Sequence, residues 1–386
     1  MSANATSVGL DVHARSVVAC GLDGRSGELF ERRLTPDHGD IVSWVRSLPG
    51  PVTVVYEAGP TGFGLARHLT GQGIECLVAA PSRLQRPSGD RVKTDVRDAR
   101  HLARVLHLGV IVAVTVPSVE QEAARDLVRA REDVRGDLMA ARHRLSKLLL
   151  RQGIVYYGGK PWTGSHDLWM RARRRTEVFT VAGLGLAFDI AYDTTLATVA
   201  RRDRLDAAIT AMAAQSEFTP VVTRLGCVRG VATLTAFGLA VEIGDWTRLS
   251  GRSIGAYLGL VPTESSSGGS RSQGSITKTG NGHARRLLIE AAWHHRQPFR
   301  HPGVDLRRRW EKATPAARDR GQRANAAPAR AVGRLRCPPQ AGRCREHCDR
   351  PRAGRLVLVV GGPGRLTSGR PRRDVRMIHG GDGSAL

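Results

Sequence analysis

The chain has 386 residues, of which 41% are hydrophobic, and its 59 Lys and Arg outnumber its 35 Asp and Glu to give a net charge of +24. This length exceeds what one hydrophobic core usually fills, so two or three domains are expected. No apolar run reaches the roughly 18 residues of a membrane span and the first residues are polar, so we expect a cytoplasmic protein that does not enter a membrane. A positive charge of this size normally faces phosphate groups, which makes nucleic acid the expected partner and the nucleoid the expected location.

The first hundred residues show the pattern of an α/β domain. Its predicted strands lie, in chain order, at residues 8–13, 16–22, 52–56 and 75–79, with a helix at residues 63–69 before the last strand. Asp11 lies partway along the first strand, and Glu57 stands where the third strand ends and a loop opens. Ligand sites of open α/β sheets form at the carboxyl ends of strands, so both acids are candidate site residues.

An amphipathic helix is predicted within residues 93–106, and two acids lie near its N-terminus. Asp95 and Asp98 are three residues apart, which places them on a common helix face. Acids also stabilise a helix N-terminus through the helix dipole, so this pair alone is weak evidence of a site. Together with Asp11 and Glu57, however, it predicts a four-carboxylate site for two Mg²⁺ (or Mn²⁺) ions, an arrangement that serves phosphoryl transfer.

Three stretches of this region carry the motifs of a known family. They read GLDVH near the N-terminus, VVYEAGPTGFGLARHL in the middle and KTDVRDARHLARVL at the end. In this order they resemble the ribonuclease-H-like, Holliday-junction-resolvase-like domain of DEDD insertion-sequence transposases, a family that includes the pilin gene inverting recombinase and bridge-RNA-guided recombinases. The resemblance implies a metal-binding tetrad formed by Asp11, Glu57, Asp95 and Asp98. Lys93 and Arg97 lie beside these acids and either contact phosphate or only balance their charge.

A helical arm is predicted after this first domain, which we place at residues 1–112. Residues 119–151 read as one long polar helix with a narrow apolar stripe, typical of a coiled coil or of a helix that lies along a partner. Residues 153–175 are predicted to be a linker or loop, and helical patterning resumes at residues 194–214. We therefore expect a helical coiled-coil arm at residues 113–215, and the resemblance implies that such an arm supports dimer assembly.

Residues 216–300 are predicted to form a small α-rich domain with a helix-hairpin-helix-like start. Gly226 and Gly230 bound a turn between two helices, and this turn either holds a phosphate backbone through its N–H groups or is simply tight. The stretch TESSSGGSRSQGSITKTGN follows and is predicted to be a flexible, hydroxyl-rich loop among basic side chains. Its candidate phosphate contacts are Arg271, Lys278, Arg285 and Arg286.

The serine-rich stretch carries a second resemblance. The segment AYLGLVPTESSSGGSRSQGSITKTGNGHARRLLIEAAW resembles the C-terminal domain of the same transposases, where a serine of the SSG element attacks DNA. The resemblance implies that Ser266 or Ser267 is a covalent nucleophile, and the triple serine does not separate the two. A serine that attacks phosphorus must lose its proton and needs its leaving oxygen stabilised, which arginines or tetrad-bound metal ions would provide in a composite site built from both domains.

The last region, residues 301–386, carries 20 Lys and Arg against 7 Asp and Glu and has no sustained apolar periodicity. We expect a basic, disordered tail, most clearly beyond Asn325, and a frame-shifted reading of the gene would explain its composition.

The sequence therefore predicts a DNA transposase or site-specific recombinase that binds donor and target DNA as a homo-oligomer, a dimer or a tetramer. The resemblance adds a structured guide RNA as a partner, although basic charge does not distinguish RNA from DNA. Three alternatives stay open: a Holliday-junction-resolvase-like nuclease, a kinase of the actin-like fold and a non-catalytic nucleic-acid binder. The nuclease would use the tetrad with water and form no covalent intermediate, the kinase leaves the paired acids unexplained, and the binder would not depend on Mg²⁺.

Overall fold

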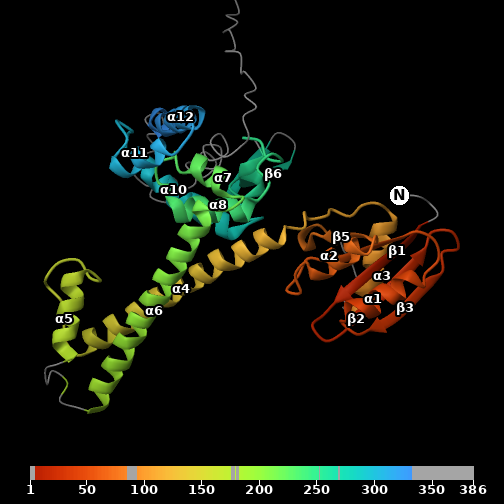
Figure 1. The fold of residues 1–386 in the computed structure, drawn as a ribbon, viewed down its shortest axis with the longest axis horizontal. Coiled ribbons are helices and arrows are strands. Elements are labelled where there is room, and N and C mark those ends of the chain that lie inside the picture. The colour runs from red at the N-terminus through yellow and green to blue at the C-terminus, as the bar shows by residue number, and fades with distance from the viewer. Residues whose placement is uncertain are drawn as a thin grey trace, which may run out of the picture. The chain divides into compact units, whose positions relative to one another are not determined.

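The computed structural model describes residues 5–84, 94–174, 179, 182–251, 253–267 and 270–332 (Figure 1). The chain folds as two compact units, Met1–Glu120 and Gln121–Leu386, each of which is described by itself. The first unit continues past residue 112, because Val114 N donates a hydrogen bond to Val78 O and Ala113 bridges to Ala79.

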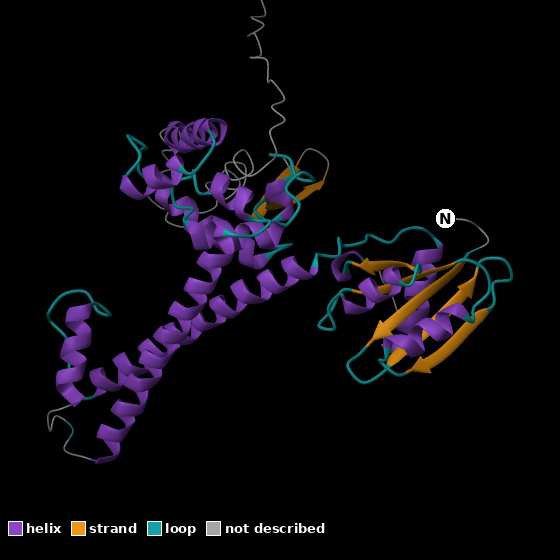
Figure 2. Ribbon diagram, in the orientation of Figure 1, coloured by secondary structure: helices purple, strands orange, loops and turns teal. Residues whose placement is uncertain are grey.

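The first unit is built on a five-stranded mixed sheet with the strand order β3-β2-β1-β4-β5 (Figure 2). The strands are β1 (Thr6–Val12), β2 (Val17–Asp23), β3 (Leu29–Leu34), β4 (Val52–Glu57) and β5 (Glu75–Ala79). The helices are α1 (His38–Arg46), α2 (Gly64–Gly71), the 3₁₀ turn η1 (Pro81–Arg83) and α3 (Asp95–His107). Neighbours β1, β2 and β3 run antiparallel, whereas β1, β4 and β5 run parallel. The α/β class predicted for this part of the chain is confirmed.

Alternation along the strands divides the core of the first unit between the two sheet faces. Val8 and Leu10 of β1 pack in one cluster with residues of α1 and α2. The residues between them face α3, which packs against Val18 and Cys20 of β2 through its small residues. Because Gly9 and Asp11 share that second face, the register of β1 decides which side chains lie under α3.

The second unit begins with two long helices. Its first three helices are α4 (Val119–Arg151), α5 (Gly164–Arg174) and α6 (Ala182–Ala214). Near one end of the pair Val128 and Ile209 belong to one core cluster, and toward the other end Leu145 and Phe188 belong to another, so α4 and α6 run antiparallel. The long helix predicted at residues 119–151 is confirmed, and a coiled coil stays a prediction.

Residues 153–175 are not only a loop, because α5 lies within them. The sequence pattern did not predict this helix, because its buried side is narrow and shows no repeat of aliphatic residues. Its buried residues are His166 and Met170, and the His166 ring packs against Trp162 and Trp169.

The rest of the second unit packs small helices and a β-hairpin. These elements are α7 (Thr219–Leu225), α8 (Thr233–Ile243), α9 (Ile254–Tyr257), β6 (Pro262–Ser267), β7 (Ser270–Ile276), α10 (Gly282–Trp293), the 3₁₀ turn η2 (His294–Arg296), α11 (Val304–Glu311) and α12 (Pro315–Val332). The serine-rich stretch predicted to be a flexible loop is thus an antiparallel hairpin, because its backbone pairs from Pro262 with Ile276 to Ser267 with Ser270. Among the described residues no helix is both long and apolar enough to cross a membrane.

The expectation of disorder from residue 301 onward is wrong for its first part. Leu306, Ala317 and Ala324 of α11 and α12 are buried. Asn325 donates to Cys227 O and accepts from Arg229 N, which ties α12 to the turn after α7. Small residues make this packing, and their weak hydrophobic signal explains why periodicity missed it. Residues 333–386 lie outside the described residues.

Candidate functional site

Asp11 is placed by the packing of α3 on the central strand. A Cβ added to Gly9 would lie 2.2 Å from Ala99 O and 2.5 Å from Ala103 N, so only glycine lets α3 approach β1 this closely. Asp11 is two residues further along the same strand and therefore faces the same side. The contact at Gly9 thus sets the distance between Asp11 and the first turn of α3.

The first turn of α3 carries the other two aspartates of the predicted tetrad. Thr94 caps the helix, with its Oγ1 accepting a hydrogen bond from Arg97 N. Asp95 and Asp98 follow in the first turn, as the sequence predicted, where they also interact favourably with the helix dipole. Arg97 is exposed, and a role in phosphate contact stays a prediction.

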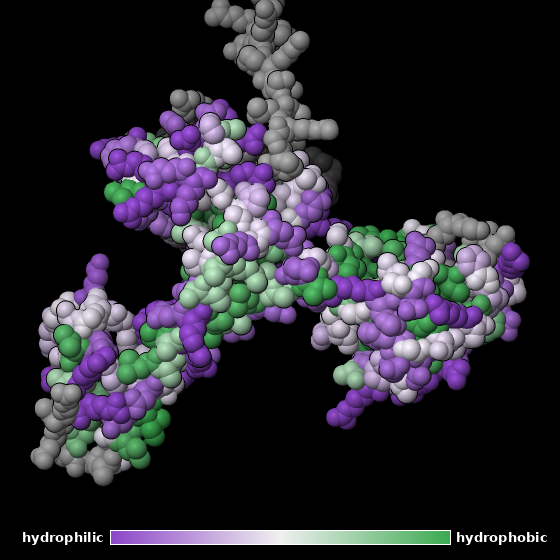
Figure 3. Space-filling view, in the orientation of Figure 1, coloured by the Kyte–Doolittle hydropathy of each residue, from purple (hydrophilic) through white to green (hydrophobic). Residues whose placement is uncertain are grey.

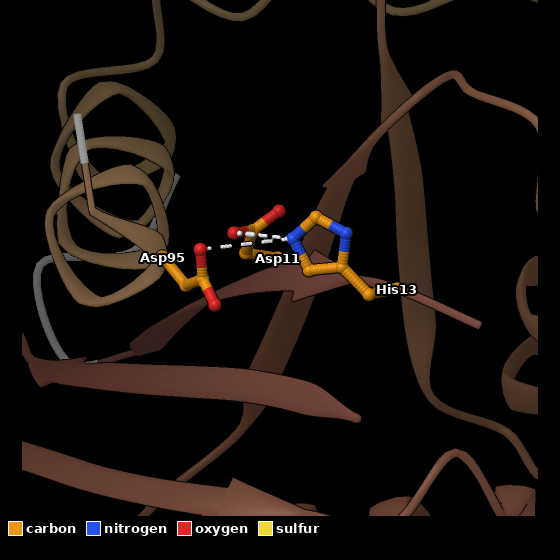
Figure 4. Close-up of side chains that lie close together, drawn as sticks. All are labelled: Asp11, His13 and Asp95. Atoms are coloured by element: carbon orange, nitrogen blue, oxygen red, sulfur yellow. Dashed lines mark hydrogen bonds and ion pairs between the residues drawn. The ribbon is translucent and has the colours of Figure 1, made fainter. Parts of the chain in front are cut away.

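Three side chains converge at the end of β1 (Figure 4). His13 Nε2 lies 3.1 Å from Asp11 Oδ2 and 3.8 Å from Asp95 Oδ1. One ligand atom of each of the three residues lies within 4.8 Å of the other two. Arg33 Nη2 of β3 lies 3.6 Å from Asp95 Oδ2, so a second cation borders the acids.

The electrostatics of Asp11 are those of a carboxylate crowded by other acids. Burial raises the pKa of Asp11, the charges of Asp95 and Asp98 raise it further, and the neighbouring His13 acts in the opposite direction. A divalent cation between these groups would relieve the repulsion. Carboxylate oxygens are the ligands that hard divalent cations prefer, so the residues present fit such an ion.

Glu57 ends β4 beside Asp11. In the parallel pair of β1 and β4, Leu10 pairs with Tyr56, which places Glu57 at the level of Asp11 on the neighbouring strand. Its side chain is exposed, and neither Glu57 nor Asp98 belongs to the group of ligand atoms around His13. The structure therefore brings Asp11 and Asp95 together with His13, a residue that the sequence analysis missed although it alternates with Asp11.

The predicted nucleophiles lie on the hairpin of the second unit. Ser266 and Ser267 end β6, and both are exposed. Ser266 Oγ donates a hydrogen bond of 3.0 Å to Glu264 Oε1, and Gln273 Nε2 of β7 reaches Glu264 Oε2 at 3.4 Å. The Ser266 hydroxyl therefore lies next to a proton acceptor, and a nucleophilic role for either serine stays a prediction.

A buried carboxylate contacts the start of α10, the helix that follows this hairpin. Glu242 of α8 has no exposed side-chain surface, and Asn281 and His283 at the start of α10 contact it at 2.6 and 3.0 Å. Asn281 Oδ1 also caps α10 by accepting from Ala284 N. A lone Glu in an otherwise apolar helix was the signal for this cluster, and sequence analysis passed over it.

The remaining predicted phosphate contacts have varied surroundings. Arg285 Nη1 donates to the carbonyls of Leu258 and Thr279, and Arg286 pairs with Glu132 and Glu290. Lys278 is exposed at the end of the hairpin. Lys93 and the side chain of Arg271 lie outside the described residues. For all of these, contact with nucleic acid stays a prediction.

Gly226 and Gly230 lie at the turn between α7 and α8. Gly226 caps the end of α7. At Gly230, which has φ of 82°, an added Cβ would lie 2.6 Å from Ala291 O of α10. The close approach of α10 gives Gly230 a packing role, and a phosphate role for the turn stays a prediction.

Comparison with known proteins places both regions in one family. A transposase model of the DEDD type matches residues 8–153, and a model described as the transposase IS116/IS110/IS902 family matches residues 222–302. The protein y4qE of Sinorhizobium fredii is 35% identical over 76% of this chain and 72% of its own length. The transposase for insertion sequence element IS1533 of Leptospira borgpetersenii is 31% identical over 75% of this chain and 85% of its own length.

The chain belongs to the IS116/IS110/IS902 family of transposases. Members of such a family are enzymes that cut and rejoin DNA, and the DEDD type implies the use of a divalent metal. The first match contains the tetrad residues and His13. The second contains the serine hairpin and the contacting pair Glu242 and Asn281.

Proposed function

We propose that this member of the IS116/IS110/IS902 family is the recombinase of an insertion sequence, with a metal-binding tetrad on the first unit and a serine nucleophile on the second. The observation that carries the proposal is the convergence of Asp11 and Asp95 at the end of the central strand, with Asp98 one turn along the same helix. The sheet order β3-β2-β1-β4-β5 supports a ribonuclease-H-like fold for this unit. The tetrad comprises Asp11, Glu57, Asp95 and Asp98.

The tetrad would act by holding divalent cations, Mg²⁺ or Mn²⁺, against a DNA phosphate. When bound, such ions polarise the phosphoryl group and stabilise charge on the leaving oxygen. Asp11 is less exposed than Asp95, since its side chain is 20% exposed against 45% for Asp95. Asp11 therefore anchors the site from the rigid strand, while Asp95 and Asp98 approach from the helix end.

We assign the nucleophilic attack on the DNA phosphate to Ser266 in preference to Ser267. Ser266 Oγ already donates to Glu264, so Glu264 can accept its proton as the Oγ–P bond forms. One bridging P–O bond of the DNA strand then breaks, and its oxygen leaves as a hydroxyl after protonation. The strand is held as a phosphodiester to the serine, and a second DNA hydroxyl reverses the step to join a new strand. Arg271, Lys278, Arg285 and Arg286 would support the phosphates.

The partners of the enzyme would be donor and target DNA and a structured guide RNA. The net charge of +24 supports binding of phosphate backbones of either kind. RNA and DNA that co-purify with the protein, once sequenced, identify the partners. Recovery of DNA alone would remove the guide RNA from the proposal.

The enzyme would act as a homo-oligomer that associates through the arm. Figure 3 shows apolar surface along the arm helices. Leu150, Leu186 and Ile190 are 54, 62 and 59% exposed, and burial of such residues against a second copy would stabilise a dimer or tetramer. The molar mass in solution tests this, and the Ile190→Asp protein should dissociate. A monomeric mass for the unchanged protein would contradict the assignment.

The central experiment compares cleavage of donor DNA by active-site variants. Asp11→Asn and Asp95→Asn should abolish Mg²⁺-dependent cleavage, whereas Glu28→Gln on an exposed turn of the same unit should not. Full cleavage by Asp95→Asn would remove α3 from the mechanism.

The nucleophile is tested on denaturing gels of quenched reactions. A covalent protein–DNA adduct should form and should disappear in Ser266→Ala, while Ser265→Ala keeps it. Loss in Ser267→Ala instead would move the role to Ser267. DNA cleavage without any adduct would favour the resolvase-like nuclease that uses water.

A further inference from the structure

We propose that His13 is a metal ligand of the tetrad site and that it makes the site bind Mn²⁺ in preference to Mg²⁺. The inference rests on the proposed function, because it assumes that the acids bind a divalent metal. The tetrad of Asp and Glu contains only oxygen donors, so a histidine ligand changes which metal suits the site.

The positions of the ligand atoms support direct binding. His13 Nε2 and Asp11 Oδ2 are 3.1 Å apart, close to the separation of about 3 Å that neighbouring ligand atoms have around one octahedral ion with bonds near 2.1 Å. Asp95 Oδ1 is 3.8 Å from the same nitrogen. Asp95 is at the first turn of α3 and is 45% exposed, so its carboxylate can rotate toward an ion shared with His13 (Figure 4).

The fold places His13 there for local reasons. β1 ends at Val12, and His13 N donates to Ser16 O in the tight turn that leads into β2. Residues two apart along an extended chain face the same side, so His13 continues the face of Gly9 and Asp11. Because Gly9 lets α3 lie close on that face, the first turn of α3 ends beside the imidazole.

The alternative role for His13 is that of a cation that only balances the acids. Arg33 already lies 3.6 Å from Asp95 and supplies a permanent charge from β3. An imidazole differs from a guanidinium because a neutral ring nitrogen offers a lone pair to a metal. Nε2 faces both carboxylates and donates a hydrogen bond to Asp11 Oδ2. A divalent ion would take the place of that proton, so that the same nitrogen becomes a ligand.

The nitrogen donor predicts the choice of metal. Mg²⁺ keeps oxygen ligands and water, whereas the divalent ions of the first transition series accept an imidazole nitrogen more readily. Mn²⁺ is the weakest binder of that series, but it still tolerates a nitrogen ligand better than Mg²⁺ does. We expect the His13→Ala change to weaken Mn²⁺ binding by about tenfold or more and to change Mg²⁺ binding by less than about threefold. His107→Ala is the matched control, because His107 is exposed at the opposite end of α3.

The test measures metal binding by the full chain without DNA. Titration of Mn²⁺ by electron paramagnetic resonance gives the affinity, and pulsed measurements on the bound ion detect coupling to a ligating ¹⁴N nucleus. The unchanged protein and His107→Ala should show the nitrogen coupling, and His13→Ala should bind Mn²⁺ more weakly and lose the coupling. Circular dichroism checks that each variant is folded.

The outcomes separate this inference from the proposed function. Mn²⁺ binding that is lost in Asp11→Asn but shows no nitrogen coupling, or a coupling that survives in His13→Ala, would overturn the role of His13 and leave the tetrad standing. If the unchanged protein binds no Mn²⁺, or if Asp11→Asn binds it equally well, both the tetrad site and its histidine are refuted.

Discussion

Arg129 of α4 holds the carboxylate of Glu242 of α8 through two hydrogen bonds of 3.0 Å, from Nε to Oε1 and from Nη2 to Oε2. The same carboxylate contacts Asn281 and His283 at the start of α10. One buried charge thus joins α4, α8 and the start of α10. Its partners satisfy it, as a buried carboxylate requires.

The first prediction concerns acid stability of the second unit. Burial alone would raise the pKa of Glu242, but hydrogen bonds from His283, Arg129 and Asn281 lower it from 4.5 to about 2. A carboxyl with a lowered pKa in the folded state stabilises the fold above its unfolded pKa, and this stability is lost as the pH falls from 4.5 through about 2. The contribution is about 3 kcal/mol at neutral pH.

Glu242→Gln should remove that pH dependence and increase hydrogen exchange in α8 and α10 at pH 7. The matched control is Glu290→Gln, because Glu290 forms an exposed pair with Arg286 that contributes little. Equal exchange in the two variants would show that the buried cluster does not hold the elements together.

The second prediction concerns His295, which is buried in η2 with its Nε2 2.8 Å from Arg229 O. Burial lowers its pKa from 6.5 to about 4, so the ring is neutral in the folded protein. As the pH falls, the imidazole of the unfolded chain is protonated at a higher pH than that of the folded protein. Folding stability is therefore lost as the pH falls from 6.5 toward 4. His295→Gln should flatten the melting temperature across this range, whereas His294→Gln on the exposed neighbour should keep the slope.

The third prediction concerns the contact that sets the tetrad. Gly9→Ala places a Cβ against the backbone of α3 and should cost about 1–3 kcal/mol as the helix moves away from the sheet. Asp95 moves with the helix, so even the folded Gly9→Ala protein should bind Mn²⁺ more weakly than the unchanged protein. Gly71→Ala in α2 is the control, since nothing lies within 4 Å of its added Cβ. Unchanged Mn²⁺ affinity in the Gly9 variant would contradict the positioning role.

The fourth prediction concerns α12. Asn325→Ala leaves Arg229 N without its side-chain acceptor, at a cost of about 1–3 kcal/mol, while Cys227 O keeps the hydrogen bond that Trp310 Nε1 donates. Hydrogen exchange over residues 315–326 should rise, and Gln322→Ala on the exposed side of the helix should leave it unchanged. No difference between the two would mean that α12 is not anchored through Asn325.

The sequence by itself determined the elements whose reasons are local. Runs of apolar and β-branched residues mark β1 and β4, and the paired acids with an apolar stripe behind them mark α3. The order of Asp11, Glu57 and the paired aspartates then indicated the site and the family. Hydrophobic periodicity acts within a few residues, so it can be recognised without knowing what the chain packs against.

Only the tertiary structure decided the features that depend on distant partners. β3 is a charged edge strand whose pairing with β2 needs no apolar alternation, and α12 packs through small residues that give little hydrophobic signal. The serine stretch becomes a hairpin through pairing of its own two halves. His13 joins Asp95 across more than 80 residues because α3 lies directly on Gly9, and such a contact depends on backbone approach in space, which no local pattern encodes.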